Sequence, residues 1–332
     1  MNTVTRFYVL ASLLGAGLVT PACTVASAPP PATAPAASAP AVSTSATPQR
    51  QFATPEDAVK ALLASTQAHD KPALREIFGP DSQDLVSGDK VEDANAAAAF
   101  AKALAQFCRL SYESNDKVVL NIGAQDWPFP IPLVKKDGRW FFDTAAGKDE
   151  IINRRVGENE LTVIGVCRTY VTAQREYASE DRDDSGVLKY AQNLKSTPGQ
   201  KDGLYWEPAA GEELSPFGPL VASARAEGYG PRKEGEAPQP FHGYLFRILT
   251  AQGRHAPGGQ YNYTINGNMI AGFALVAHPA RWGDSGIMTF IINQQGKVYQ
   301  RNLGPDTDAK VAAMTAFDPE EGWTLVPPPG SQ

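Results

Sequence analysis

The 332-residue chain has few cysteines and only a small excess of negative charge. It carries three cysteines and four histidines, its formal net charge is −6, and it contains no run rich in Lys and Arg. Binding to nucleic acid needs a basic surface, so we expect no nucleic-acid partner. No Gly-Lys-Ser/Thr phosphate loop occurs either. We therefore expect no cofactor and no resident metal ion.

The N-terminus predicts an export signal. Arg6 provides a positive charge, and the apolar stretch FYVLASLLGAGLV that follows is too short for a comfortable membrane span. Cys23, in VTPAC, predicts a lipid-modified bacterial lipoprotein, whereas residues 26–28 (Ala-Ser-Ala) predict ordinary cleavage before Pro29. We favour the lipoprotein. In both cases residues 1–28 export the chain, and we expect a periplasmic protein held to a membrane by a lipid anchor.

Composition divides the rest of the chain into four parts. Residues 29–50 are almost wholly Pro, Ala, Ser and Thr, which cannot bury enough apolar surface to fold, so they predict a disordered tether. Residues 51–150 and 151–326 predict two folded modules. Residues 327–332 predict a disordered tail.

The first module predicts helices followed by strands. Thr54 is predicted to cap a helix that begins at Pro55, and further helices are predicted over 71–79 and 91–107. Strands are predicted over 117–123 and 129–145, with a hairpin turn at Asp-Gly 137–138. This order is similar to the α+β cone of nuclear-transport-factor-2-like (NTF2-like) or SnoaL-like folds. Such cones often hold a pocket, which Asp126, Trp127 and Asp143 would line; alternatively they are core and turn residues.

The apolar pattern of the second module predicts one helix packed on an antiparallel sheet. Residues 158–181 carry apolar side chains at 163, 166, 170, 173 and 177, which is helical spacing with a wide apolar face. A short helix is predicted over 215–228 and a last one over 306–317. The strands between them are predicted over 243–253, 261–265, 269–280, 286–293 and 297–304.

Two resemblances follow from these segments. The strings DWPFPIPLVKKDGRWFFDTAAGKDEI, HGYLFRILTAQG and NGNMIAGFALVAHPARWGDSGIMTFIINQQGKVYQRNLGPDT resemble the bacterial family called domain of unknown function 2950, from about residue 52 to 326. Because that family has no known activity, the resemblance implies no catalytic residue. The order VCRTYVTAQREYA, GYLFRI and INQQGKVY is also similar to the globular part of type IV pilins and pseudopilins. In this chain the corresponding helix is internal and charged, so it would not assemble as pilin helices do.

Residues 283–286, Gly-Asp-Ser-Gly, are similar to the nucleophile loop of trypsin-like proteases. A nucleophilic serine needs a histidine base within hydrogen-bond reach, and His278 or His242 would have to supply it. The glycines and the Asp-Ser pair equally suit a turn between strands, which is the interpretation we favour. The alternative is an envelope hydrolase that uses Ser285.

The loop DRDDSG has the oxygen spacing that opens a calcium-binding EF-hand loop. Asp181, Asp183 and Ser185 would be the ligands, but Gln192 stands where a bidentate Glu is needed. We expect a solvated acidic turn rather than a calcium site.

A possible binding surface is predicted from aromatic residues and a glycine-rich loop, QGRHAPGGQYNY. Exposed aromatics beside glycines suit glycans or partner proteins; alternatively these aromatics are core. The predicted surface comprises Tyr205, Trp206, Tyr229, Arg254, His255 and Trp282.

Cys108 and Cys167 remain after export, and they either pair in an oxidising compartment or are two small buried hydrophobes. Together these features predict an exported envelope protein that is non-catalytic and binds another envelope component, either a protein or a glycan.

Overall fold

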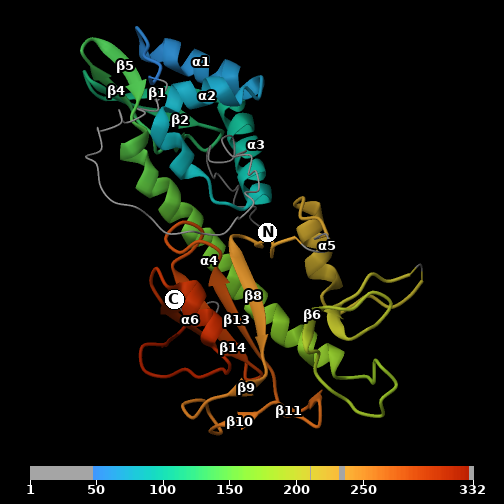
Figure 1. Ribbon diagram of the computed structural model, residues 1–332. Helices are drawn as coiled ribbons and strands as arrows, with labels where there is room; N and C mark the ends of the chain where they lie inside the picture. The colour runs from blue at the N-terminus through green and yellow to red at the C-terminus, as the bar shows by residue number, and fades with distance from the viewer. Residues whose placement is uncertain (1–47, 210, 232–235, 329–332) are drawn as a thin grey trace, which may run out of the picture. The chain divides into compact units, whose positions relative to one another are not determined.

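The computed structural model describes residues 48–209, 211–231 and 236–328 (Figure 1). The predicted export signal with Cys23, residues 29–47 of the predicted tether and the last four residues lie outside this part of the chain. The described residues form two compact units. Residues 48–84 and 103–146 form the N-terminal unit, and residues 85–102 and 147–328 form the C-terminal unit. Within the described ranges, no helix has the length and apolar character needed to cross a membrane.

Two capped helices open the N-terminal unit. In α1 (Pro55–Gln67) the Thr54 hydroxyl accepts a hydrogen bond from the Asp57 backbone N–H at 3.1 Å, which confirms the predicted cap. In α2 (Lys71–Phe78) the Asp70 carboxylate caps the Ala73 N–H in the same way. A 3₁₀ helix, η2 (Pro80–Leu85), follows α2.

An antiparallel sheet in the order β1-β2-β4-β5, with β3 paired to β2, completes this unit. Its strands are β1 (Cys108–Ser114), β2 (Lys117–Ile122), β3 (Trp127–Pro128), β4 (Leu133–Lys136) and β5 (Arg139–Phe142). Asp137 and Gly138 both have positive φ, 51° and 77°, as a two-residue hairpin turn requires. Strand β1 was not predicted, because most of its side chains are exposed and show no apolar alternation.

Aromatic side chains from both layers form the core of the N-terminal unit. The rings of Phe78, Phe129 and Phe142 pack with centroids 5.2 to 6.3 Å apart. The residues predicted to line a pocket in this unit have other contacts. Asp126 pairs with Arg109, and the Asp143 carboxylate accepts the Ala146 N–H in the first turn of the next helix.

Helix α4 (Thr144–Tyr177) is longer than the sequence predicted. The prediction began near Glu158, and this was wrong because the preceding turns are mainly polar and include two glycines, which hides the helical period. The predicted apolar stripe is confirmed: Val163, Tyr170 and Tyr177 are buried within the C-terminal unit.

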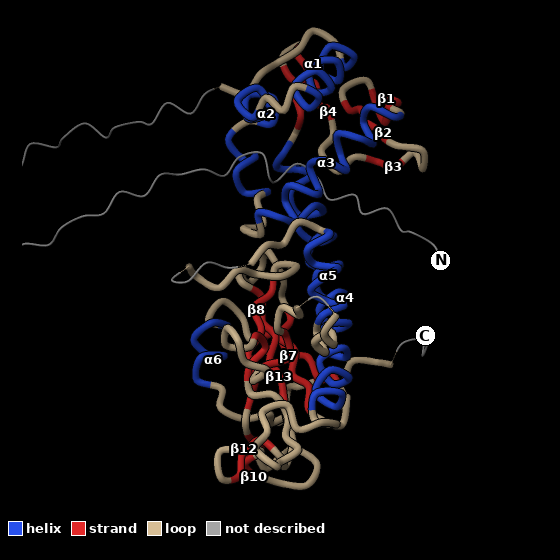
Figure 2. The backbone as a smooth tube through the Cα atoms, turned by 90° about the vertical axis from the view of Figure 1, so that its right-hand side faces the viewer, coloured by secondary structure: helices blue, strands red, loops and turns tan. Residues whose placement is uncertain are grey.

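A five-stranded antiparallel sheet in the order β16-β15-β14-β13-β8 forms the centre of the C-terminal unit. Its strands are β8 (Tyr244–Leu249), β13 (Ala274–Pro279), β14 (Met288–Asn293), β15 (Val298–Asn302) and β16 (Thr324–Leu325). Helix α4 covers one face and the short helix α6 (Thr307–Ala313) covers the other (Figure 2). Because both faces are covered, strand β13 is buried along nearly its whole length.

The remaining described elements of the C-terminal unit are helices and pairs of short strands. They are α3 (Lys90–Gln106, of which 90–102 belongs to this unit), α5 (Gly218–Ala226), the parallel pair β6 (Asn193–Lys195) and β7 (Gly203–Tyr205), and the antiparallel pairs β9 (Ala251–Gln252) with β10 (Tyr261–Asn262) and β11 (Thr264–Ile265) with β12 (Asn268–Met269). The predicted α+β class is confirmed. The resemblances to NTF2-like cones and to pilins are not confirmed and stay predictions.

Candidate functional site

The protease-like loop between β13 and β14 is folded around Ser285. This side chain is fully buried. Its hydroxyl accepts a hydrogen bond from the Arg281 N–H at 3.0 Å and donates one to the Arg281 carbonyl at 3.2 Å. The hydroxyl therefore closes a turn with its own neighbours, which is the role that short polar side chains often take in loops.

The two candidate histidine bases have other partners. His278 lies on the side of the sheet that α6 covers, with its Nδ1 3.4 Å from a carboxylate oxygen of Asp308, and burial lowers its pKa. Ser285 lies on the opposite side, where its carbonyl accepts a hydrogen bond from Asn159 of α4. The Nε2 atom of His242 is 2.9 Å from a Glu227 carboxylate oxygen. No hydrogen bond between Ser285 and a histidine ring occurs within the described residues, so the geometry does not assemble a nucleophile and base.

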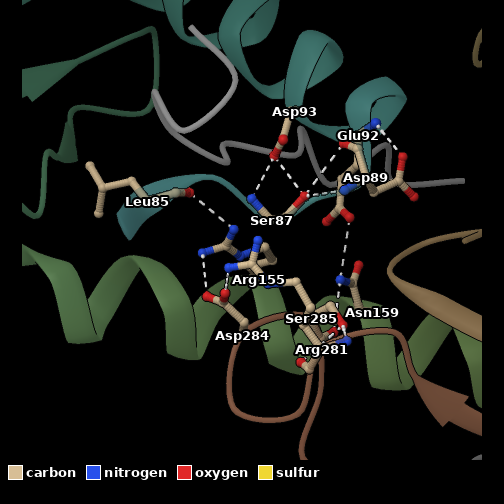
Figure 3. A network of polar contacts seen from close by, with 10 residues as sticks. All are labelled: Leu85, Ser87, Asp89, Glu92, Asp93, Arg155, Asn159, Arg281, Asp284 and Ser285. Atoms are coloured by element: carbon tan, nitrogen blue, oxygen red, sulfur yellow. Dashed lines mark hydrogen bonds and ion pairs between the residues drawn. The ribbon is translucent and has the colours of Figure 1, made fainter. Parts of the chain in front are cut away.

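Charged side chains connect the loop between β13 and β14 to α4 (Figure 3). Asp284 pairs with Arg281 and lies 3.9 Å from the buried guanidinium of Arg155, which also donates to the Leu85 carbonyl at 3.0 Å. These contacts give the Gly-Asp-Ser-Gly segment a structural role, because each polar group in it is used to hold the loop.

A cluster of carboxyl groups surrounds the start of α3 (Figure 3). Asp89 caps the helix by accepting the Glu92 N–H at 3.1 Å, and its second oxygen accepts the Tyr229 hydroxyl at 2.8 Å. The Glu92 carboxyl accepts a hydrogen bond from Asn159 at 3.3 Å. Burial, and then the nearby charge of Asp89, raise the pKa of Glu92 to about 8. Glu92 is therefore mainly protonated at neutral pH, which limits the charge repulsion in the cluster.

A cavity of about 50 Å³ lies beside this cluster, between Glu92, Tyr229 and His242. Ligand pockets typically measure about 300–1,000 Å³, so this cavity has room for water and not for an organic substrate of ordinary size. We therefore assign the cluster a structural role.

The acidic turn expected at residues 181–186 is held by hydrogen bonds to its own backbone. Asp181 accepts hydrogen bonds from the N–H groups of Ser185 and Gly186 at 3.2 and 2.7 Å, and Asp183 pairs with Lys189. In the described part of the chain, no group of three or more His, Cys, Asp or Glu side chains is arranged to hold a metal ion.

Two members of the predicted binding surface belong to the core. Trp206 and Tyr229 are only 7% and 8% exposed, so for these two residues the structure agrees with the alternative that the aromatics are core. Tyr229 is held by Asp89, and Trp206 lies beneath the cationic groups of Arg182 and Lys201. Tyr205 is partly exposed and stacks with Arg225.

An open groove of about 460 Å³ lies between α6 and β15. Its apolar lining comes from Ile291, Leu303, Met314 and Trp323. Its polar lining comes from Arg301, Asn302, Lys310, Thr315, Asp318 and Glu320. Ligand pockets typically measure about 300–1,000 Å³, so this groove is large enough for a small organic ligand or part of a polymer.

The charged side chains of the groove differ in whether they form ion pairs. Arg301 forms an ion pair with Glu320, with a nitrogen–oxygen distance of 3.0 Å. Asp318 accepts the His255 backbone N–H at 2.8 Å and lies 3.1 Å from its ring Nδ1. Lys310 donates to the Leu303 carbonyl at 2.5 Å and forms no ion pair with any described residue. Lys310 is therefore the cation of this groove that is not neutralised by a carboxylate.

Two other predicted surface residues, His255 and Trp282, contact residues that line this groove. His255 binds Asp318, and the guanidinium of Arg254 donates to the His255 ring at 3.2 Å. Trp282, which is 38% exposed, donates its indole N–H to Asn302 at 2.9 Å. The sequence therefore located part of the surroundings of the groove but missed Lys310 and Trp323. The sequence signal that could have indicated Trp323 is a tryptophan in a polar segment, EEGWT, close to the end of the chain.

Comparisons with known proteins give one finding. The model of a family described as "Protein of unknown function (DUF2950)" matches residues 49–326. No curated protein and no solved structure matches the chain.

Proposed function

The chain belongs to this family of proteins of unknown function, and on that premise we propose that it is a non-catalytic, exported envelope protein that binds another envelope component in the groove between α6 and β15. The groove carries the proposal. It combines an aromatic side chain, Trp323, with several polar groups, as ligand-binding pockets commonly do. A second tryptophan, Trp282, contacts its wall through Asn302.

The state of Ser285 supports binding rather than catalysis. A nucleophile must be accessible to substrate and bonded to a base, whereas the Ser285 hydroxyl is buried and bonded to the Arg281 backbone. The alternative of an envelope hydrolase therefore has less support from the geometry.

Support for export and anchoring comes from the sequence before residue 48. The apolar N-terminal stretch, Cys23 and the Pro/Ala/Ser-rich segment have the layout of a tethered lipoprotein. Mass spectrometry of the mature protein from a bacterial host is expected to find an acylated Cys23. A free N-terminal Pro29 would show ordinary cleavage and would remove the lipid anchor from the proposal.

The binding proposal is tested by co-sedimentation of an unlipidated chain, which begins after Cys23, with an envelope fraction of the host, because an acylated Cys23 would itself carry every variant into the membrane pellet. We expect wild-type chain in the pellet, and a loss of roughly tenfold in affinity for Trp323→Ala, because a buried interface aromatic commonly contributes more than about 1 kcal/mol. Leu161→Ala is the matched control, since Leu161 lies on α4 and is 72% exposed. Absence of wild-type binding, or equal binding by Trp323→Ala, would contradict the proposal.

A further inference from the structure

We propose that the ligand of the groove between α6 and β15 is a saccharide that carries a carboxylate, with a sugar ring on Trp323 and the carboxylate at Lys310. This inference rests on the proposed function, because it names the ligand class of the same groove. Three properties of the groove support this ligand class: its volume, its mixed apolar and polar lining, and the unpaired charge of Lys310.

The size of the groove fits a short saccharide better than a protein surface. A stable protein–protein interface buries about 800 Å² on each partner, over a surface that is usually flat. The groove is instead a concave space of about 460 Å³ bounded by α6, β15 and residues 313–323. A few linked sugar rings, which are compact and rigid, are suited to a space of this kind.

The lining of the groove fits the two surfaces of a sugar ring. A pyranose has an apolar face made of C–H groups and an edge of hydroxyls. Trp323 offers a flat apolar surface for the face, and the partly buried Met314 also lines the groove. A lipid chain would leave the polar lining of this groove without hydrogen-bond partners, which costs free energy.

Polar groups at the rim are available to the hydroxyls. The Asn302 oxygen accepts from Trp282 and from the Gly304 N–H, both at 2.9 Å, which holds the amide in one orientation. Neither the Asn302 NH₂ group nor the exposed Thr315 hydroxyl has a hydrogen bond to another described residue. Both groups therefore can bind a ligand without first breaking an internal bond.

The two cations and two carboxylates that line the groove sum to zero formal charge, so its preference for an acidic ligand comes from the position of Lys310. Glu320 neutralises Arg301, and the Asp318 carboxylate accepts from the His255 backbone. Lys310 binds only a backbone carbonyl, so its ammonium group can pair with a carboxylate at no cost to an existing ion pair. A partly exposed pair of this kind is worth up to about 1 kcal/mol, which corresponds to a preference of up to roughly fivefold.

Two disaccharide probes test the inference by titration calorimetry on the full mature chain. One is the neutral β-1,4-linked dimer of N-acetylglucosamine. The other has the same linkage, but its reducing ring carries a lactyl carboxylate. We expect both to bind wild type, with the acidic probe about threefold to fivefold tighter. In Lys310→Gln the preference is expected to disappear while the neutral probe keeps its affinity. Lys297→Gln, in the exposed turn after β14, is the matched control and should keep the preference. Trp323→Ala should weaken both probes by roughly tenfold.

The possible outcomes separate this inference from the proposed function. Equal affinity for the two probes would overturn the role of Lys310. Failure of both probes, together with Trp323-dependent co-sedimentation that protease treatment of the envelopes abolishes, would show a protein partner. The saccharide would then be wrong while the groove remained the binding site. Failure of the co-sedimentation itself would remove the proposed function.

Discussion

Glu92 in the first turn of α3 is the residue whose substitution tests the carboxyl cluster most directly. Burial is the main cause that raises its pKa from 4.5 to about 8, and the charge of Asp89 adds to it. We consider Glu92→Gln, because glutamine has nearly the same shape and its side-chain oxygen still accepts the hydrogen bond from Asn159. The substitution therefore removes the titration of this side chain with little change in packing.

The sign of the effect follows from where the proton is held. In the unfolded chain a glutamate releases its proton near pH 4.5, whereas folded Glu92 keeps it up to about pH 8. Between these values the folded state binds more protons, so the free energy of unfolding falls as the pH rises and levels off above about 8. Each pH unit in this window is worth about 1.4 kcal/mol, so the whole window is worth a few kcal/mol. Glutamine has no proton to lose in either state.

The assay is urea unfolding at several values between pH 5 and pH 9, followed by circular dichroism. We expect Glu92→Gln to match wild type near pH 5 and to be more stable by a few kcal/mol near pH 9. Titrating groups that do not interact with Glu92 are present in both proteins and cancel in the difference. Asp89 and Asp93 interact with Glu92, but their contribution is smaller because burial is the main cause of its pKa shift. Glu321→Gln, at an exposed carboxyl, is the control and should follow wild type. Parallel curves for Glu92→Gln and wild type would refute the reasoning.

Three further predictions concern packing and reactivity. Gly286→Ala is expected to destabilise the protein by roughly 2–4 kcal/mol in thermal or urea unfolding, because a β-carbon there would overlap the buried Tyr244 hydroxyl. Gly283→Ala, in the same loop but in open space with φ +84°, should cost only about 1 kcal/mol, and equal losses would contradict this account. Both thiols are free, and the exposed Cys108 should react with a disulfide reagent in the native protein, whereas Cys167, whose pKa burial raises to about 12, should react only after unfolding. A serine-reactive phosphonate is expected to leave Ser285 unlabelled, and stoichiometric labelling detected by mass spectrometry would restore the hydrolase.

Local sequence signals predicted much of the secondary structure. The cap at Thr54, the hairpin at Asp137 and the apolar stripe of α4 depend on contacts between residues close in sequence, and all three occur in the structure. The errors arose where local signals are weak. Strand β1 is largely exposed and polar, and the first turns of α4 contain glycines and few apolar side chains.

The sequence predicted only some of the residues around the groove. Trp282 and His255 were selected because aromatic and basic residues beside glycines suit binding, and both contact groove-lining residues. Trp206 and Tyr229 were selected for the same reason but are buried. Residue type does not distinguish a buried aromatic from an exposed one, because burial depends on segments distant in sequence.

The sequence by itself determined the α+β class, the family and most of the helices and strands, since these follow from short-range patterns of apolar residues, caps and turns. Only the tertiary structure decided the role of Ser285, whose turn packs against Asn159 from a helix more than a hundred residues earlier in the chain. It likewise decided the groove, which forms because α6 lies across the sheet and brings Lys310 to the same space as Trp323. The physical reason is the same in both cases: the charge, burial and hydrogen bonds of a side chain depend on which distant segments fold against it.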